Sequence, residues 1–194
     1  GGDRVPENLP STPLVAIEAV VLDTETTGLD ARTARIVQIG ILRMAGKERD
    51  DHRSLECLVN PGVAIPPAST AIHGIRDSHV AASPPFAELA QAIDDFIGGS
   101  IVIGHSIAYD LFVLRRENQL AGRSWAIPRA LDVRVLARIA APSLVDHSLD
   151  RLCEWLTVPL TGRHSAMGDA QATARVFSAL VPHLRAKGVR TLAE

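Results

Sequence analysis

Apolar and β-branched residues gather in three runs in the first third of the chain, and these runs predict β-strands. Val15–Leu22 and Arg35–Met44 are nearly continuous apolar runs, whereas Ser54–Val59 alternates apolar and polar residues. The polar segment Gly46–Asp51 predicts a turn between the second and third runs. Short polar links between neighbouring strands favour an antiparallel arrangement in this part of the fold.

From residue 83 onward the pattern alternates between strand and helix periods. Ser83–Pro84 is a helix start signal, and apolar residues in Phe86–Ile97 then recur at helical spacing until Gly98. The same reasoning predicts a strand at Ile101–Gly104, a helix at 108–119, a short strand at Ala130–Asp132, and helices near 133–140, 148–156 and 166–186. This order predicts an α/β domain, with a mixed β-sheet flanked by α-helices.

Length and local composition set the expected domain boundaries. A chain of 194 residues favours one domain with a sizeable core. Residues 1–13 carry three prolines and no periodicity, so we expect a flexible leader or linker there. The folded domain is then expected at 14–186, with a C-terminal tail at 187–194.

The overall composition excludes several classes of protein. With 46% hydrophobic and 22% charged residues, the chain resembles ordinary globular proteins. No apolar run reaches the roughly 20 residues that span a bilayer, and no signal peptide is visible, so we expect a cytoplasmic protein without membrane contact. Cys57 and Cys153 lack metal-ligand spacing, which favours two buried thiols. Because the net charge is −2, binding of a polyanion would need local basic clusters or bound metal.

Four acidic residues follow predicted strands or open predicted helices. Asp23 and Glu25 come directly after the buried run Val20–Leu22 and share one strand face. Carboxylates this close repel each other unless a cation neutralises them, and hard divalent cations prefer such oxygens. Taken alone, the pair is equally explained by a strand that runs into a polar turn. Asp110 and Asp169, each in the first turn of a predicted helix, are individually explained as helix-dipole stabilisers.

Taken together, these acids resemble the DEDD family of 3′-to-5′ exonucleases, in its histidine-containing subtype. The motifs that carry the resemblance are Asp23-x-Glu25-Thr26-Thr27-Gly28, His105 to Asp110, and His164 to Asp169, supported by Ile72-His73-Gly74-Ile75 between the first two. The resemblance covers roughly residues 14 to 185. It implies a ribonuclease H-like fold with a five-stranded mixed sheet.

The resemblance also implies the catalytic residues. Two Mg²⁺ or Mn²⁺ ions would be held by Asp23, Glu25, Asp110 and Asp169, and two such ions can stabilise the attacking and leaving oxygens of a phosphoryl displacement. His164 would be the general base, since a neutral imidazole can accept a proton near pH 7.

Four further residues are expected to bind substrate. By position in the family pattern, Thr26 and Leu29 would contact the terminal nucleotide, and Ile72 and Tyr109 would help line the same pocket, where Tyr109 offers a stacking face. The roles of His73 and His105 stay open between structural hydrogen bonding and substrate contact.

The sequence departs from the family pattern at two positions. Ser106 stands where Asn is usual, and Tyr109 where Phe is common. These departures concern the positioning of Asp110 and the substrate preference.

The expected function is metal-dependent removal of nucleotides from the 3′ end of single-stranded nucleic acid, releasing nucleoside 5′-monophosphates. DNA is favoured and RNA is retained as a substrate, and a polymerase or an attached domain is the expected protein partner. The alternative is a non-catalytic module of the same fold that binds nucleic acid or a polymerase. A phosphohydrolase with an Asp nucleophile is disfavoured, because Glu25 replaces the second Asp that it needs and the chain has only two lysines.

Overall fold

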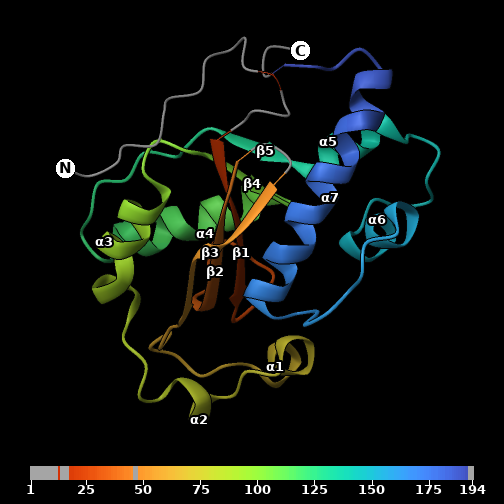
Figure 1. Cartoon of the computed structure of the whole chain (residues 1–194). Helices are drawn as coiled ribbons and strands as arrows, with labels where there is room; N and C mark the ends of the chain where they lie inside the picture. Colours follow the sequence, from red (N-terminus) through yellow and green to blue (C-terminus); the bar gives the residue numbers. More distant parts are fainter. Residues whose placement is uncertain (1–12, 14–17, 46–47, 192–194) are drawn as a thin grey trace.

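The structure is a computed structural model that describes residues 13, 18–45 and 48–191. Within these residues the chain forms five strands and seven helices (Figure 1). Their bounds are β1 (Glu18–Thr26), β2 (Ile36–Ala45), β3 (Glu48–Leu58), α1 (Pro67–His73), α2 (Asp77–Val80), α3 (Phe86–Ile97), β4 (Ile101–Gly104), α4 (Ile107–Leu120), β5 (Ala130–Asp132), α5 (Val133–Ala140), α6 (Leu149–Leu156) and α7 (Ala166–Ala186).

The strands form one sheet with the order β3-β2-β1-β4-β5. β1 pairs with β2 and β2 with β3 in antiparallel fashion, whereas β4 pairs parallel to β1 and to β5. The α/β class and the five-stranded mixed sheet are therefore confirmed, with the antiparallel pairs in the first half of the chain.

Helices cover both faces of the sheet. On one face α5, α6 and α7 bury Ala19 and Val21 of β1, and on the other α3 and α4 bury Val20 and Leu22. Figure 1 shows α7 on one side of the strands and α3 and α4 on the other. Because strand side chains alternate between faces, the residues that follow in β1 also alternate between the α7 side and the α4 side.

Several predicted bounds were wrong. β1 continues through Thr26, so Asp23 and Glu25 lie inside the strand rather than after it. β3 starts at Glu48 instead of Ser54, so most of the predicted Gly46–Asp51 turn is strand, and residues 46–47 lie outside the described residues. The polar start of β3 carries no apolar alternation, and it forms strand through backbone pairing with β2.

Other predictions were incomplete or fall where the structure describes little. The short helices α1 and α2 were not predicted, since four to seven residues are too few for a helical period to show. Cys153 is buried as expected, but Cys57 is only partly buried because it lies on the edge strand β3. Residues 15–17 of the first predicted strand and most of the predicted leader lie outside the described residues. No helix in the described part of the chain is long and apolar enough to cross a membrane.

Candidate active site

β1 carries two carboxylates to the α7 side of the sheet. Asp23 and Glu25 continue the face of Ala19 and Val21, which are covered by α7. Carboxylate oxygens of Asp23, Glu25 and Asp169 all lie within 4.8 Å of one another. The structure thus brings together three of the four acids that the resemblance implies as metal ligands.

Two residues of β2 let the first turn of α7 approach this closely. Gly40 pairs with Asp23, and a Cβ on Gly40 would lie 2.7 Å from the backbone nitrogen of Met167. The Gln38 side chain accepts a hydrogen bond from the backbone N–H of Ala166 at 2.9 Å. Glycine is therefore required where helix and strand backbones meet, and Asp169 is placed by that contact.

Asp110 reaches β1 from the opposite face of the sheet. It lies in the first turn of α4 and is buried, and its Oδ1 accepts hydrogen bonds from Thr24 N at 3.1 Å and Thr24 Oγ1 at 2.6 Å. Thr24 lies between Asp23 and Glu25 in β1, so its side chain points to the α4 side. Asp110 is outside the group of three carboxylates, yet its charge acts on both acids of β1.

Burial and repulsion between charges raise the pKa values of three acids, Asp23, Glu25 and Asp110. Burial, followed by the charges of Asp110, Asp169 and Glu25, raises the pKa of Asp23 well above its usual value. Burial and the neighbouring aspartates raise the pKa of Glu25 to about 8. Burial raises the pKa of Asp110 to about 7, although the hydrogen bonds from Thr24 act to lower it. Nearby positive charge would therefore stabilise the ionised forms of these acids.

The donor set fits a hard divalent cation. Asp23 Oδ2 is buried and has no hydrogen-bond partner among the described residues. An unpartnered buried carboxylate oxygen is costly, and carboxylate oxygens are the ligands that Mg²⁺ and Mn²⁺ prefer. The site thus fits a divalent cation on the chemistry of its own side chains.

Arg163 is a charged group at this site that the sequence reasoning missed. Its Nη1 donates to Asp169 Oδ2 at 2.8 Å, and its Nε donates to Asp150 Oδ1 at 2.6 Å. Its charge lowers the pKa of both Asp23 and Glu25. The available signal was its place directly before His164 in the third motif.

His164 lies in the loop that leads into α7. Its backbone N–H donates to Asp169 Oδ1 at 3.0 Å, and its φ is 66°, in the left-handed region. Its Nδ1 lies 3.2 Å from Arg163 Nη1. Since a guanidinium only donates, Nδ1 is the acceptor in this contact.

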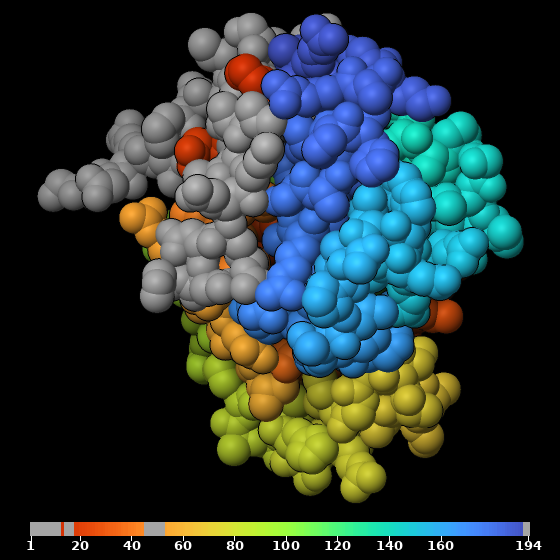
Figure 2. Space-filling view, turned by 45° about the vertical axis from the view of Figure 1, so that its right-hand side comes forward, coloured from red at the N-terminus to blue at the C-terminus, as the bar shows by residue number. Residues whose placement is uncertain are grey.

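A pocket of about 530 Å³ opens beside Glu25. All four residues expected to bind substrate line it, namely Thr26, Leu29, Ile72 and Tyr109. Leu29 is 87% exposed and Ile72 is 50% exposed, so their apolar side chains are available to a ligand. In Figure 2 the yellow surface of residues near 70 lies below the light-blue surface of residues near 160. The same pocket is lined by Glu25, so it adjoins the acids.

Hydrogen bonds fix the polar wall of this pocket. Tyr109 Oη donates to Gly28 O at 2.5 Å and lies 2.7 Å from Thr26 Oγ1. His73, which also lines the pocket, has Nε2 3.0 Å from Thr26 O and accepts from Ile75 N at Nδ1. Because Nδ1 is an acceptor, Nε2 donates, and His73 holds the end of β1.

The remaining residues of the second motif have structural partners. His105 Nε2 lies 2.7 Å from His147 O, and it does not line the pocket. Ser106 adopts a φ of 55°, and its backbone N–H donates to Asp132 Oδ1 at 3.0 Å. A left-handed residue before α4 is compatible with Ser and with the Asn that is usual in the family, since Asn tolerates this conformation well.

Several known proteins resemble this chain over most of its length. The model of the exonuclease family (RNase_T) matches residues 20–177. A DNA polymerase III subunit epsilon-like protein of Rhodobacter capsulatus is 40% identical over 94% of this chain, and the DNA polymerase III subunit epsilon of Rickettsia typhi is 33% identical over 85% of it. The chain covers 26% of the first protein and 74% of the second. It covers 12% of the PolC-type DNA polymerase III of Caldanaerobacter subterraneus, at 30% identity.

Solved structures share the fold at lower identity. E. coli exonuclease I in complex with a dT13 oligonucleotide has a TM-score of 0.75 at 17% identity, covering 88% of this chain and 42% of that one. Exonuclease X in complex with 5′ overhanging duplex DNA has a TM-score of 0.67 at 23% identity, covering 88% of this chain and 93% of that one. The fold, the family match over most of the chain and the relatives agree, and the chain belongs to the exonuclease family.

Proposed function

We propose that this exonuclease domain removes nucleotides from the 3′ end of single-stranded DNA and releases nucleoside 5′-monophosphates. The observation that carries the proposal is the buried, unpartnered oxygen of Asp23, within a carboxylate cluster at the edge of an apolar pocket of about 530 Å³. Such a pocket accommodates a nucleoside, and the cluster is poised to act on the phosphate attached to it.

The cation-binding residues are proposed to be Asp23, Glu25, Asp110 and Asp169, with two Mg²⁺ or Mn²⁺ ions per site. When bound, the ions would neutralise the cluster and stabilise negative charge on the oxygens of the displaced phosphate. The chain itself positions two of the carboxylates through hydrogen bonds. Thr24 and Arg163 each hold one aspartate by hydrogen bonds before any cation arrives.

His164 is proposed as the general base that takes the proton from the attacking water molecule. The water oxygen bonds to phosphorus as its proton moves to the imidazole. The bond from phosphorus to the 3′ oxygen breaks, and the shortened strand leaves with that oxygen, which takes a proton from solvent. The Nδ1 lone pair is engaged by Arg163. We therefore expect this contact to open when substrate binds, so that the ring is free to accept the proton.

The pocket residues are proposed to hold the terminal nucleoside. Leu29 and Ile72 would pack against the base with their exposed apolar side chains. The hydroxyl of Tyr109 is already used by Gly28 and Thr26, so its ring face is the part available for stacking. Thr26 would act through its backbone and by fixing the loop.

The wider setting is proposed from the relatives. Several are DNA polymerase III proteins of which this chain spans only a part, which supports action next to a polymerase or an attached domain in the cytoplasm. Exonuclease I and exonuclease X were solved with DNA, which favours DNA over RNA here. A non-catalytic module is the weaker alternative, since all four acids and His164 are present.

The test is a gel time course with 5′-labelled single-stranded DNA and RNA of one sequence, with Mg²⁺, with Mn²⁺ and with chelator. We expect a ladder that shortens from the 3′ end only with cation, faster on DNA. Asp23→Asn should retain less than about a thousandth of the rate, because it removes a charged ligand of the cations. Asp95→Asn, at an exposed acid on α3, is the matched control and should match the parent. No cleavage by the folded parent would overturn the proposal.

A further inference from the structure

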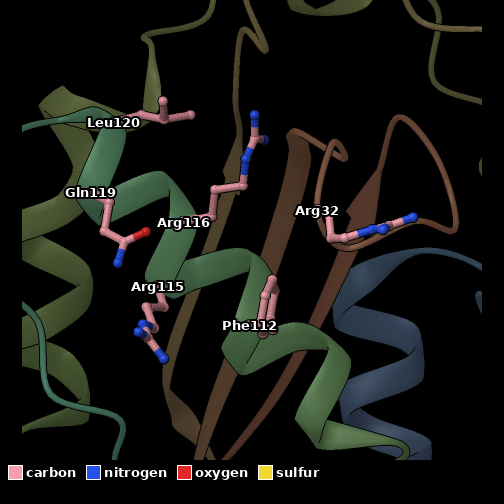
Figure 3. Close-up of a pocket in the computed structure, with 6 residues that line it drawn as sticks. All are labelled: Arg32, Phe112, Arg115, Arg116, Gln119 and Leu120. Atoms are coloured by element: carbon pink, nitrogen blue, oxygen red, sulfur yellow. The ribbon is translucent and has the colours of Figure 1, made fainter.

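A second groove lies beside the active-site pocket and takes no part in the site described above. It has a volume of about 330 Å³ and is lined by Arg32, Phe112, Arg115, Arg116, Gln119 and Leu120 (Figure 3). Five of these residues stand on α4 at the spacing i, i+3, i+4, i+7 and i+8, which is one continuous helix face. Arg32 comes from the loop between β1 and β2.

The groove and the active-site pocket take lining residues from the same two elements, α4 and the loop between β1 and β2. Tyr109 and Leu29 line the pocket, whereas Phe112 and Arg32 line the groove. Tyr109 and Phe112 are three residues apart on α4, so their side chains are neighbours on the helix surface. A chain-like ligand that ends in the pocket can therefore run on into the groove without leaving these elements.

The groove also has the chemistry of a nucleic-acid surface. Phe112 is 45% exposed and Leu120 is 56% exposed. Arg115 is exposed and has no hydrogen bond or ion pair within the part of the chain that the structure describes, and Arg116 donates to the carbonyl of Ala34. Arg32 is paired with Asp30 and points away from α4 in Figure 3, so Arg115 and Arg116 supply the charge along the helix.

We propose that this groove binds the nucleotides that precede the 3′-terminal one, with Arg115 on a phosphate and Phe112 stacked on a base. The inference rests on the proposed exonuclease function. Arginine with an exposed aromatic ring is the combination that binds single strands without sequence preference. A protein of net charge −2 with an acidic centre needs such a local basic face to hold a polyanion.

The test compares two substrates of the parent and its variants. The p-nitrophenyl ester of thymidine 5′-monophosphate needs only the acidic centre and the pocket, whereas an eight-residue thymidine oligonucleotide also reaches the groove. Arg115→Glu should raise the KM for the oligonucleotide about tenfold and leave hydrolysis of the ester unchanged. Arg115→Lys should retain most of the oligonucleotide binding, and Phe112→Ala should lose about fivefold through stacking.

The matched control is Arg175→Glu. Arg175 is exposed on α7, six residues after Asp169, much as Arg115 is five residues after Asp110, but it lies on the other side of the sheet. We expect it to leave both substrates unchanged. A loss of oligonucleotide binding in Arg175→Glu, with Arg115→Glu unaffected, would mean that the strand follows α7 and would overturn the proposal.

Two other outcomes would also overturn it. One is a KM for the oligonucleotide that no groove substitution changes. The other outcome combines two results: Arg115→Glu keeps the parent's KM for the oligonucleotide, and a short acidic peptide binds the parent but not Arg115→Glu. That outcome would make the groove a protein-docking site. Failure of the exonuclease proposal itself looks different, because the parent would then hydrolyse neither substrate.

Discussion

Helices α4 and α7 each bring one aspartate to β1, from opposite faces of the sheet, but they hold it in different ways. Asp110 on α4 accepts two hydrogen bonds from the uncharged Thr24. Asp169 on α7 accepts from the cationic Arg163 and from the backbone of His164. The α4 side therefore supplies fixed dipoles, whereas the α7 side supplies a charge and the proposed base.

The positions of the two aspartates therefore depend on different features of the fold. The α7 side depends on a loop with a left-handed His164 and on a tight contact with Gly40, so it is sensitive to backbone position. On the α4 side, Asp110 is held by one residue of β1, through its backbone N–H and its hydroxyl, and the hydroxyl bond is sensitive to side-chain chemistry. Substitutions on the two sides should separate these dependencies.

The largest effect should come from the proposed base, which exists only on the α7 side. His164→Asn keeps a residue that tolerates the left-handed conformation, so the loop should keep its shape. We expect the turnover rate to fall about 10²- to 10⁴-fold while cation binding is retained. The measurement is the rate between pH 6 and pH 9 in parent and variant, and superimposable profiles would remove His164 as the base.

A smaller effect should come from the glycine contacts of the two helices. Gly40→Ala would push its Cβ into the backbone of α7, whereas Gly104→Ala meets the side chain of Ile107 on α4. Backbone cannot move aside cheaply, so Gly40→Ala should lower the free energy of unfolding by about 1–3 kcal/mol and reduce activity by displacing Asp169. Urea unfolding and a rate assay of both variants check this. Equal losses of stability and activity in the two variants would contradict the greater sensitivity of the contact between β2 and α7.

On the α4 side, Thr24→Val removes the hydroxyl donor to Asp110 and keeps the backbone donor. The hydroxyl hydrogen bond stabilises the charged carboxylate of Asp110. Its loss should therefore raise the pKa of Asp110 further above about 7. We expect about tenfold lower activity at pH 7 that recovers toward pH 9. Thr24→Ser should behave like the parent. A deficit in Thr24→Val that does not vary with pH would contradict this account.

The smallest effect should be the change of stability with pH, to which acids from both faces of the sheet contribute. Burial raises the pKa of Glu25 to about 8 and that of Asp110 to about 7, so the folded protein keeps protons that the unfolded chain releases above about pH 4. The cation-free protein should therefore become less stable as pH rises from about 4 to about 8. Thermal melting in chelator should show this fall, and added Mg²⁺ should raise Tm more at pH 8 than at pH 5. A cation-free Tm that rises over this range would be the opposite result.

The periods of strand and helix predicted where the acids lie, but not that they form one site. Alternation along β1 puts Asp23 and Glu25 on one face, and helical spacing gave the bounds of α4 and α7 to within about two residues, a normal uncertainty at helix ends. The family resemblance then supplied the pairing of these elements, which periodicity alone does not encode.

Other features depend on chain geometry that no local pattern carries. Arg163 reaches Asp169 only because the loop after Gly162 folds back onto the start of α7. The groove on α4 depends on which helix face the sheet leaves exposed, and its mixture of Phe112, Arg115 and Leu120 has no simple amphipathic pattern. The polar start of β3 forms strand through backbone pairing with β2.

The most direct test of the account is a Mn²⁺ titration followed by electron paramagnetic resonance, with parent, Asp23→Asn and Asp95→Asn. The account predicts two ions per chain for the parent and for Asp95→Asn, and weakened binding with fewer ions for Asp23→Asn, because the unpartnered Asp23 oxygen is central to the cluster. Binding of Mn²⁺ by Asp23→Asn with the stoichiometry and affinity of the parent would contradict it.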